Sequence, residues 1–250
     1  TITGDKPTVE NVILKNATEG IGIGITWYRS LVKECELHCT EGSGNSHPAV
    51  WVNADYGAYS RIEGCKVYGD WYDGIYCPVN GIVKDNEVHS VSHGGIYIPS
   101  SYVPGNCRIE NNTVYNCGRN GIDVAANNCL ITGNTCYNNG RSGIAIAGYR
   151  NKAIGNTCYN NNQSDTSRGG IDIIAYSGVP DTSRNVVKGN VCYDDQDTKT
   201  QEYAIAEIND GGSSGYPDYN IITNNIALPC KTGAISTIGT NTVKANNVES

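Results

Sequence analysis

The sequence predicts an all-β solenoid in which one chain winds through about ten coils. A short alternating strand, an Asn, a second alternating strand, a polar turn and Gly-Ile-x-Ile or Gly-Ile-x-Val recur in the segments that begin at Cys107, Cys129 and Asn151. Alternation with a period of two directs every second side chain inward. The Asn-Gly dipeptides are not placed between the strands as a hairpin array would require. We therefore expect strands that stack from coil to coil.

The coils can be aligned on the recurring Asn. This position is occupied in order by Asn16, Cys35, Cys65, Asn86, Asn112, Asn134, Asn156, Asn190, Asn225 and Asn246. Equivalent residues of stacked coils lie roughly 4.8 Å apart, so each inward Asn can hydrogen-bond the Asn of the next coil. We therefore expect an inward Asn ladder, with loops in the longer coils, for example over residues 194–200 and 209–218.

The repeat covers the whole chain, which predicts a single domain over residues 1–250. Neither end shows an amphipathic helix that would cap the outermost coil. Bare strand edges pair readily with other strands. We therefore expect either a fragment of a longer protein or end-to-end or lateral self-association.

Composition excludes several classes of function. The chain has 250 residues with 18 Lys and Arg against 25 Asp and Glu, a net charge of −7, whereas a nucleic-acid partner requires a basic surface. The sequence contains no run of about eighteen apolar residues, so it predicts no transmembrane helix. No Gly-rich phosphate loop opens a helix, which argues against a nucleotide cofactor.

The eleven cysteines fit the repeat better than a metal site. Cys136, Cys158 and Cys192 lie two residues after the ladder position, where other coils carry inward apolar residues, and free Cys packs there as a small hydrophobe. Side chains on parallel neighbours point the same way, which hinders a disulfide without excluding one. No C-x-x-C pair is present, so zinc is not expected.

Three outward columns carry the candidate functional residues. The x of Gly-Ile-x-Ile gives Trp51, Tyr76, Tyr97, Asp123, Ala145 and Asp172. A second column, two residues before the Gly, includes Tyr72, His93, Arg119, Arg141 and Arg168. A third column, His38, Tyr68, His89, Tyr115, Tyr137, Tyr159 and Tyr193, is uniformly aromatic and is expected to stabilise the stacked coils.

The first two columns change from aromatic to charged residues midway along the chain, which favours a substrate groove. Trp51, Tyr76 and Tyr97 are predicted to stack on sugar rings. Arg119 and Arg168 are assigned to substrate binding, because Arg can clamp a planar carboxylate through two hydrogen bonds.

Two kinds of reaction fit the remaining candidates, Asp123, Asp172, Arg141 and His93. The two Asp lie two coils apart, roughly 9.6 Å between Cα atoms, near the carboxylate separation of inverting glycosidases. Alternatively, the Arg residues would acidify a uronate and His93 would abstract its proton, which is lyase or epimerase chemistry. No metal site is assigned, although the two Asp could hold Ca²⁺ against the substrate.

The repeat resembles the right-handed parallel β-helix family with pectate-lyase-like architecture over residues 12–248. The segments GNTCYNNGRSGIAI and RNVVKGNVCYDD are similar to coils of mannuronan C-5 epimerase modules. The resemblance implies right-handed coils. The catalytic motif of those modules is absent, because Tyr76 stands in place of its Asp, and Ala125 follows Asp123 where the motif has a His.

Two functions remain open from the sequence. The first is an extracellular or cell-surface protein that processes an acidic polysaccharide as a lyase or hydrolase. The second is a non-catalytic β-helical module such as a surface adhesin, a filament subunit or a phage-tail shaft. The switch to Asp and Arg favours the first, and the bare end coils favour the second.

Overall fold

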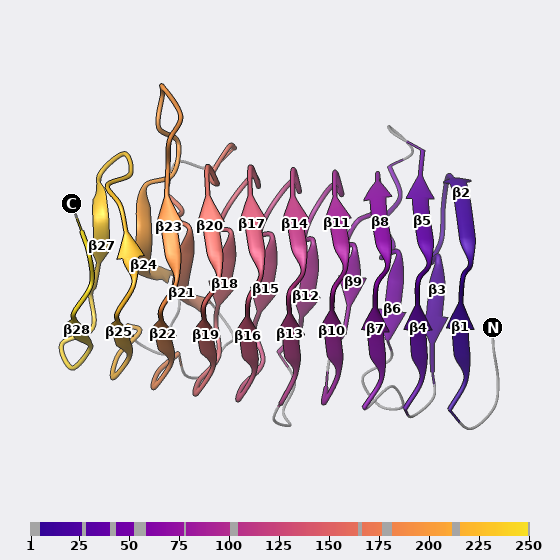
Figure 1. The fold of residues 1–250 in the computed structure, drawn as a ribbon, viewed down its shortest axis with the longest axis horizontal. Coiled ribbons are helices and arrows are strands. Elements are labelled where there is room, and N and C mark those ends of the chain that lie inside the picture. The colour runs from indigo at the N-terminus through magenta and orange to yellow at the C-terminus, as the bar shows by residue number, and fades with distance from the viewer. Residues whose placement is uncertain are drawn as a thin grey trace.

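The computed structural model describes residues 6–26, 29–40, 44–52, 59–77, 79–100, 105–164, 167–176, 182–211 and 216–249. These residues form β-strands and no helix. The strands wind into an elongated solenoid, and the two chain ends lie at opposite ends of its long axis (Figure 1). The fold class predicted from the repeat is confirmed.

Three sheets run the length of the solenoid, and neighbouring strands of each sheet come from successive coils and pair in parallel. Sheet A contains β1 (Thr8–Glu10), β4 (Leu31–Lys33), β7 (Arg61–Glu63), β10 (Ile82–Lys84), β13 (Arg108–Glu110), β16 (Leu130–Thr132), β19 (Lys152–Ile154), β22 (Val186–Lys188), β25 (Ile221–Thr223) and β28 (Val243–Ala245). Sheet B contains β2 (Ile13–Ala17), β5 (Glu36–Cys39), β8 (Lys66–Gly69), β11 (Glu87–His89), β14 (Thr113–Tyr115), β17 (Thr135–Tyr137), β20 (Thr157–Tyr159), β23 (Val191–Tyr193) and β26 (Ile226–Ala227). Sheet C contains β3 (Ile23–Ile25), β6 (Val50–Val52), β9 (Ile75–Tyr76), β12 (Ile96–Ile98), β15 (Ile122–Val124), β18 (Ile144–Ile146), β21 (Ile171–Tyr176), β24 (Tyr203–Asp210) and β27 (Gly233–Ser236).

The core lies between the three sheets and follows the period of two. In sheet A the central residues Val83, Ile109 and Ile131 are fully buried, while their strand neighbours are half-buried or exposed. Branched apolar side chains pack well on a pleated surface. Burial of one inward apolar residue per short strand therefore holds each coil to the next.

The Asn ladder runs through the core beside the turn between sheets A and B. Asn112 Nδ2 donates to Asn134 Oδ1 at 2.9 Å, and Asn134 Nδ2 donates to Asn156 Oδ1 at 3.0 Å. The chain of bonds continues from Asn156 to later coils. Each Asn also caps a backbone carbonyl, as Asn134 does with Ile109 at 2.9 Å, so these buried amides are satisfied.

The alignment of the outermost coils from sequence was wrong by a few residues. The last ladder residue is Asn247, whose Oδ1 accepts from Asn225 Nδ2 at 2.9 Å, and not Asn246. At the other end Leu14 pairs with Leu37, which places Val12 and not Asn16 beside Cys35. The end coils lack a neighbour on one side, so their pattern is less constrained.

Two further amide ladders stabilise the other turns. One joins Asn139 and Asn161 at 3.0 Å and continues to Gln201. The other joins Asn185 to Asn220 at 3.2 Å, and Asn151 donates its backbone N–H to Asn185. Sequence reasoning missed both, although their Asn residues recur at a fixed distance of five from the main ladder.

The cysteines are buried, as expected for core thiols. All eleven lie within the described residues, and no disulfide joins them. Cys136, Cys158 and Cys192 occupy neighbouring registers of sheet B. They take the place that Val occupies in the preceding strands, for example Val114.

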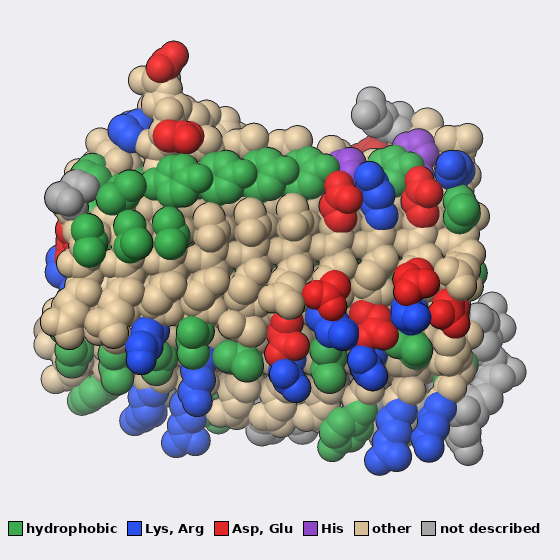
Figure 2. All heavy atoms as spheres, in the orientation of Figure 1, with side chains coloured by type: hydrophobic (Ala, Val, Ile, Leu, Met, Phe, Trp, Pro, Cys, Tyr) green, Lys and Arg blue, Asp and Glu red, His purple; other side chains and the backbone are tan. Residues whose placement is uncertain are grey.

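The third column forms a continuous aromatic ladder on the outer surface of sheet B. Its ring centroids lie 4.7–5.2 Å apart, with interplanar angles of 4–23°. Figure 2 shows it as a row of hydrophobic and His side chains above the strands of sheet B. The rings cover one another's faces and expose mainly their edges, so this row stabilises the stack of coils rather than offering a face to a sugar.

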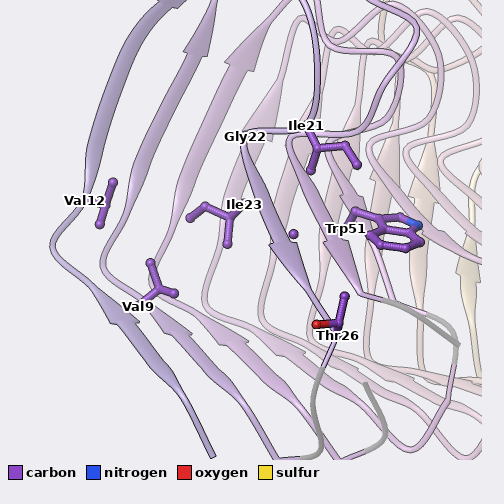
Figure 3. A pocket seen from close by; sticks show the side chains of 8 residues that line it. Val9, Val12, Ile21, Gly22, Ile23, Thr26 and Trp51 are labelled. Atoms are coloured by element: carbon purple, nitrogen blue, oxygen red, sulfur yellow. The ribbon is translucent and has the colours of Figure 1, made fainter. Parts of the chain in front are cut away.

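The N-terminal end of the solenoid is hollow. A cavity of about 460 Å³ is lined by Val9, Ile21, Ile23 and Trp51 among others (Figure 3). Gly24 leaves space there, whereas the equivalent position in the next coil carries Trp51. The first coil therefore presents apolar side chains outward at this end.

Candidate functional site

Sheet C brings the first outward column onto one face. Trp51 pairs with Tyr76, and Tyr76 pairs with Tyr97 on the next strand. The row continues from Tyr97 through Asp123. Beyond Asp123 it runs through Ala145 to Asp172. The structure thus places these predicted residues in the order that the sequence indicated.

The aromatic part of the row is partly exposed. Trp51, Tyr76 and Tyr97 are each half-buried. Tyr76 and Tyr97 meet edge to face, with ring centroids 5.6 Å apart and an interplanar angle of 70°. Burial, with a contribution from Asp123, raises the pKa of Tyr97 to about 12, so its hydroxyl remains a proton donor at neutral pH.

Asp123 ends this aromatic row. Its Oδ2 accepts a hydrogen bond from Asn120 Nδ2 at 2.7 Å. Its Oδ1 is buried, and no donor in the described part of the chain reaches it. Burial raises the pKa of the Asp123 carboxyl to about 6, while the bond from Asn120 and the charge of His93 act in the opposite direction. A carboxyl with this pKa can exchange a proton near neutral pH.

Asp172 lies in a different environment from Asp123. Its Oδ2 accepts from Ser142 Oγ at 2.6 Å and from the Gly169 backbone N–H at 2.8 Å, and the residue is fully buried. Ser142 also donates its backbone N–H to Asn120 Oδ1 at 3.2 Å. A hydrogen-bonded path through Ser142 and Asn120 therefore joins the two carboxyl groups, but only Asp123 borders the open face.

The strands β21 and β24 extend beyond their neighbours and close sheet C on the C-terminal side of Asp123. Tyr176 packs against Ala125 and Ala147, and its hydroxyl accepts from Asn120 Nδ2 at 3.3 Å. Arg168 donates from Nη2 to Asp210 Oδ2 at 2.6 Å. We call Tyr176, Arg168 and Asp210 the wall.

Burial along the outward column shows where the wall acts. The outward residues Ala145, Ala147 and Asp172 are fully buried, although their positions correspond to solvent-facing ones in earlier coils. The open part of the face therefore ends at Asp123 and extends toward Tyr97.

His93 is held by a buried acid. Its Nδ1 lies 2.8 Å from Oδ1 of Asp73, which also accepts from the Gly94 backbone N–H at 3.0 Å. The imidazole stacks on Tyr72 with centroids 4.3 Å apart. In the neutral form of the imidazole, the carboxylate holds the ring proton at Nδ1 and Nε2 is the acceptor. Sequence reasoning missed Asp73. Its position directly after Tyr72 of the second column was the signal that could have identified it.

The second column does not present its Arg residues equally. Arg141 donates its backbone N–H to Arg119, and Arg119 donates to His93, so these three lie on successive coils. Arg119 is exposed and Arg141 half-buried. Arg168 is only 4% exposed and is engaged by Asp210. The structure brings Arg119 and Arg141 toward the surface on the two coils that follow His93, whereas Arg168 forms part of the wall.

The described ranges contain no group of three or more His, Cys, Asp or Glu side chains that could hold a metal ion. Asp123 Oδ2 is bonded to the amide of Asn120, which also donates to the Tyr176 hydroxyl, and not to a second carboxyl group. These residues do not form a Ca²⁺ site of the usual oxygen-rich kind. The part of the chain that the structure describes includes no helix long and apolar enough to span a membrane.

Solved structures share this architecture. The A-module of the mannuronan C-5 epimerase AlgE4 from Azotobacter vinelandii matches with a TM-score of 0.71 and 13% identity, over 96% of this chain and 64% of that one. The Dettilon tailspike protein matches with a TM-score of 0.62 and 25% identity, over 87% of this chain and 43% of that one. The alginate lyase from Paenibacillus sp. str. FPU-7 matches with a TM-score of 0.53 and 13% identity, over 98% and 92% of the two chains.

The chain spans about 64% of the length of the epimerase module. No curated protein matches the sequence. A family model described as a right-handed beta helix region matches residues 2–104 and 78–250, nearly the entire chain. Together with the three parallel sheets, this confirms the resemblance stated from the repeat: the chain belongs to the right-handed parallel β-helix family.

Proposed function

We propose that the protein binds and processes an acidic polysaccharide on the outer face of sheet C, outside the cell or at its surface. The observation that carries this proposal is the position of Asp123, a carboxyl with a pKa of about 6 at the end of an exposed aromatic row. Arg119 and Arg141 lie in the neighbouring column, where they can bind substrate carboxylates. The similar structures named for mannuronan and alginate support a uronate substrate.

Each residue then has a distinct role. Trp51, Tyr76 and Tyr97 stack on sugar rings, because their half-buried rings form a continuous row. Arg141 and Arg119 bind the uronate carboxylate and so acidify the adjacent C–H. His93, positioned by Asp73, accepts that proton at Nε2.

The geometry favours elimination over hydrolysis. Inverting hydrolysis needs two carboxyl groups that both reach the substrate, whereas Asp172 is fully buried and bonded to Ser142 and Gly169. In elimination, the C–H bond breaks, a C=C bond forms and the glycosidic oxygen leaves with a proton. Asp123 is the donor of that proton, and Asp172 and Arg168 act as positioning residues.

The wall makes the site one-sided. Sugar units can occupy the row from Trp51 to Tyr97, but Ala145 and Ala147 beyond Asp123 are covered. We therefore infer that the substrate places one chain end near Asp123 and is shortened from that end.

The test is a screen of polyuronates, read by the absorbance of unsaturated products and by reducing ends. Both signals should rise together for a lyase, whereas reducing ends alone would indicate a hydrolase. His93→Gln and Asp123→Asn should each abolish turnover while leaving binding within about twofold, because both retain hydrogen-bonding shape but lose proton transfer. Turnover that survives both substitutions would contradict this site.

A non-catalytic glycan-binding module is the second candidate. The burial of Asp123 Oδ1 favours it, because a buried oxygen is shielded from a sugar bound on the open row. A tailspike protein is among the similar structures. This candidate predicts glycan binding that depends on Trp51 and Tyr97. It also predicts that neither product assay gives a signal.

A further inference from the structure

The outer surface of sheet A changes its charge pattern halfway along the solenoid. In the first coils basic and acidic residues pair on the same strand: Arg61 lies 2.7 Å from Glu63, and Arg108 lies 2.6 Å from Glu110. Lys84 reaches Glu63 at 3.4 Å. These pairs neutralise one another across β7, β10 and β13.

The acidic residues stop at Glu110, whereas the basic residues continue. The positions that follow Glu110 in register are Thr132, Ile154, Lys188 and Thr223. Arg150, Lys152 and Lys188 form no ion pair with any residue in the described ranges. Figure 2 shows Lys and Arg side chains gathered around β19 and β22 with no acidic side chain among them.

These basic residues surround a depression in the surface. A hollow of about 640 Å³ is lined by Arg150, Lys152, Arg184, Leu130 and Ile154 among others. We call it the basic hollow; Lys188 does not line it but pairs with Ile154, which does. The residues that line the basic hollow are both cationic and apolar.

The coils place these charges close together. Arg150 donates its backbone N–H to Ser183, the residue before Arg184, and Ile154 pairs with Lys188. Arg150 and Lys152 therefore lie roughly 7 Å apart along one coil, and Lys188 lies on the next coil, about 5 Å away along the axis. Like charges at this spacing repel one another, so the cluster is stabilised when an anion lies between them.

The rings beside the hollow suit a sugar. The Arg150 guanidinium lies 5.6 Å from the centroid of the Tyr149 ring, and that of Arg184 lies 5.9 Å from the Tyr219 centroid. Such stacking directs a planar guanidinium while leaving its N–H edge available for a carboxylate or sulfate. Leu130 and Ile154 offer apolar contact to the C–H face of a sugar ring.

We propose that the basic hollow is a second binding site, for the carboxylate or sulfate groups of an acidic polysaccharide, on a different sheet from the site at Asp123. A long nucleic acid fits less well, because its closely spaced phosphates would also meet the rest of a chain with a net charge of −7. The site has no part in the chemistry at Asp123. In a catalytic protein it would hold the polymer between turnover events. In a non-catalytic module it would contribute to binding alone.

The test compares two triple variants with equal loss of charge on the same sheet. The first carries Arg150→Gln, Lys152→Gln and Lys188→Gln. The matched control carries Arg61→Gln, Lys84→Gln and Arg108→Gln. In the unmodified protein these three basic side chains are paired with Glu63 and Glu110. Binding to polygalacturonate, heparin, uncharged dextran and a single-stranded DNA oligonucleotide is measured by calorimetry at several salt concentrations.

The first variant should lose about tenfold or more in affinity for polygalacturonate or heparin. Its slope of log affinity against log salt should fall by about 2, since three contacts to a polyanion are lost. The affinity of the control variant for these glycans should change by less than about twofold. Binding of dextran should be the same in both variants as in the unmodified protein. The Trp51→Ala protein, which loses a ring of the aromatic row on sheet C, should show the same dependence on the hollow, which separates this site from the one on sheet C.

Three outcomes would overturn the proposal. Equal weakening by both variants would show only a general effect of net charge. Tighter binding of DNA than of either glycan would identify another class of ligand. Absence of acidic glycan binding to the unmodified protein would remove the site altogether.

Discussion

At the scale of single residues, Asp123 shows how burial and neighbouring charge compete. Burial opposes its ionisation, and the Asn120 bond and the His93 charge favour it, with a resulting pKa of about 6. A buried carboxyl with a raised pKa reduces stability when it ionises. The same property that allows proton transfer near neutral pH is therefore expected to cost stability.

Replacing Asp123 with Asn should stabilise the folded protein above pH 6. Between about pH 4 and pH 6 the folded state holds a proton on Asp123 that the unfolded state has lost, so the free energy of unfolding falls as pH rises through this range. The Asn variant lacks this loss of stability and should be more stable than the unmodified protein by about 3 kcal/mol at pH 8. Urea unfolding at pH 4 and pH 8 measures the difference, and a gap that is equal at both pH values would contradict the assigned pKa.

The Asn ladder predicts a large effect from one amide. Asn134→Ala leaves the Asn112 amide without an acceptor and the Ile109 carbonyl without its side-chain donor. Each buried polar group left unpaired costs about 1–3 kcal/mol, so the loss should reach about 3 kcal/mol. Thr135→Ala on the outer side of the same coil should cost less than about 1 kcal/mol. Similar losses in the two proteins, measured by chemical denaturation, would exclude a special role for the ladder.

The sequence predicted the positions of single residues well in the coils where the repeat motif is complete. Asn86, Asn112, Asn134 and Asn156 lie in one buried stack because each follows the same short strand of its coil. Asp73 was not recognised, since its role depends on a contact with His93 in the next coil and no repeat marks it.

At the scale of secondary-structure elements, sheet B tests the assignment of the core thiols. Cys136, Cys158 and Cys192 lie on the inner side of β17, β20 and β23, and each is fully buried. Burial raises the pKa of Cys158 well above its usual value, which removes the reactive thiolate. Thiol reagents should label these residues slowly in the native protein and completely after denaturation. Rapid native labelling, located by peptide mass mapping, would place them outside the core.

The extended strands β21 and β24 give a prediction about the wall. Tyr176→Ala removes the ring that covers Ala125 and Ala147, and so should open the face beyond Asp123. Longer oligosaccharide products should then appear, and the pKa of Asp123 should move toward its ordinary value because burial is its main cause. Product chromatography and the pH dependence of turnover measure the two effects.

Tyr176→Phe is the matched control for the wall. It keeps the ring on Ala125 and Ala147 and loses only the hydroxyl that accepts from Asn120. Product length should therefore stay that of the unmodified protein. An identical product pattern in the Phe and Ala variants would show that the wall does not limit the substrate.

The wall also shows why the site was only partly predictable. The register from Trp51 to Asp172 follows from the motif that recurs in coils of 21 to 27 residues, and the structure reproduces it. The contact between Asn120 and Tyr176 joins residues 56 positions apart, across strands of unequal length. The periodic signal that aligned the columns carries no information about such an extension, so the burial of Asp172 and Arg168 could not be read from the columns.

At the scale of the whole molecule, the repeat determines the fold and leaves function to the surface. Structures that share this scaffold include an epimerase module, a tailspike protein and a lyase. One scaffold therefore carries different activities. What distinguishes this chain is the pair of surfaces where its columns stop repeating, at Asp123 on sheet C and at the basic hollow on sheet A.

The stacking of coils also predicts how stability is distributed along the solenoid. Each coil contacts only its neighbours, so a central coil is held on two sides and an end coil on one. In the centre, Asn134 and Ile131 are almost fully buried, whereas Ile13 is 64% exposed and Val243 is 54% exposed. Amide hydrogen exchange should be slowest around residues 107–160 and faster toward both ends, since local opening needs less energy where fewer contacts are lost.

The same measurement, repeated over a range of protein concentrations, tests whether the ends associate. The apolar hollow beside Val9 and Trp51 lies at the N-terminal end, and the exposed Val243 and Val248 lie at the other. If a second copy covers these ends, their exchange should slow as concentration rises, because association protects only the bound state. A monomer should show the graded pattern at every concentration. Uniform protection from end to end in a dilute monomer would contradict the nearest-neighbour account of the fold, since nothing would then distinguish an end coil from a central one.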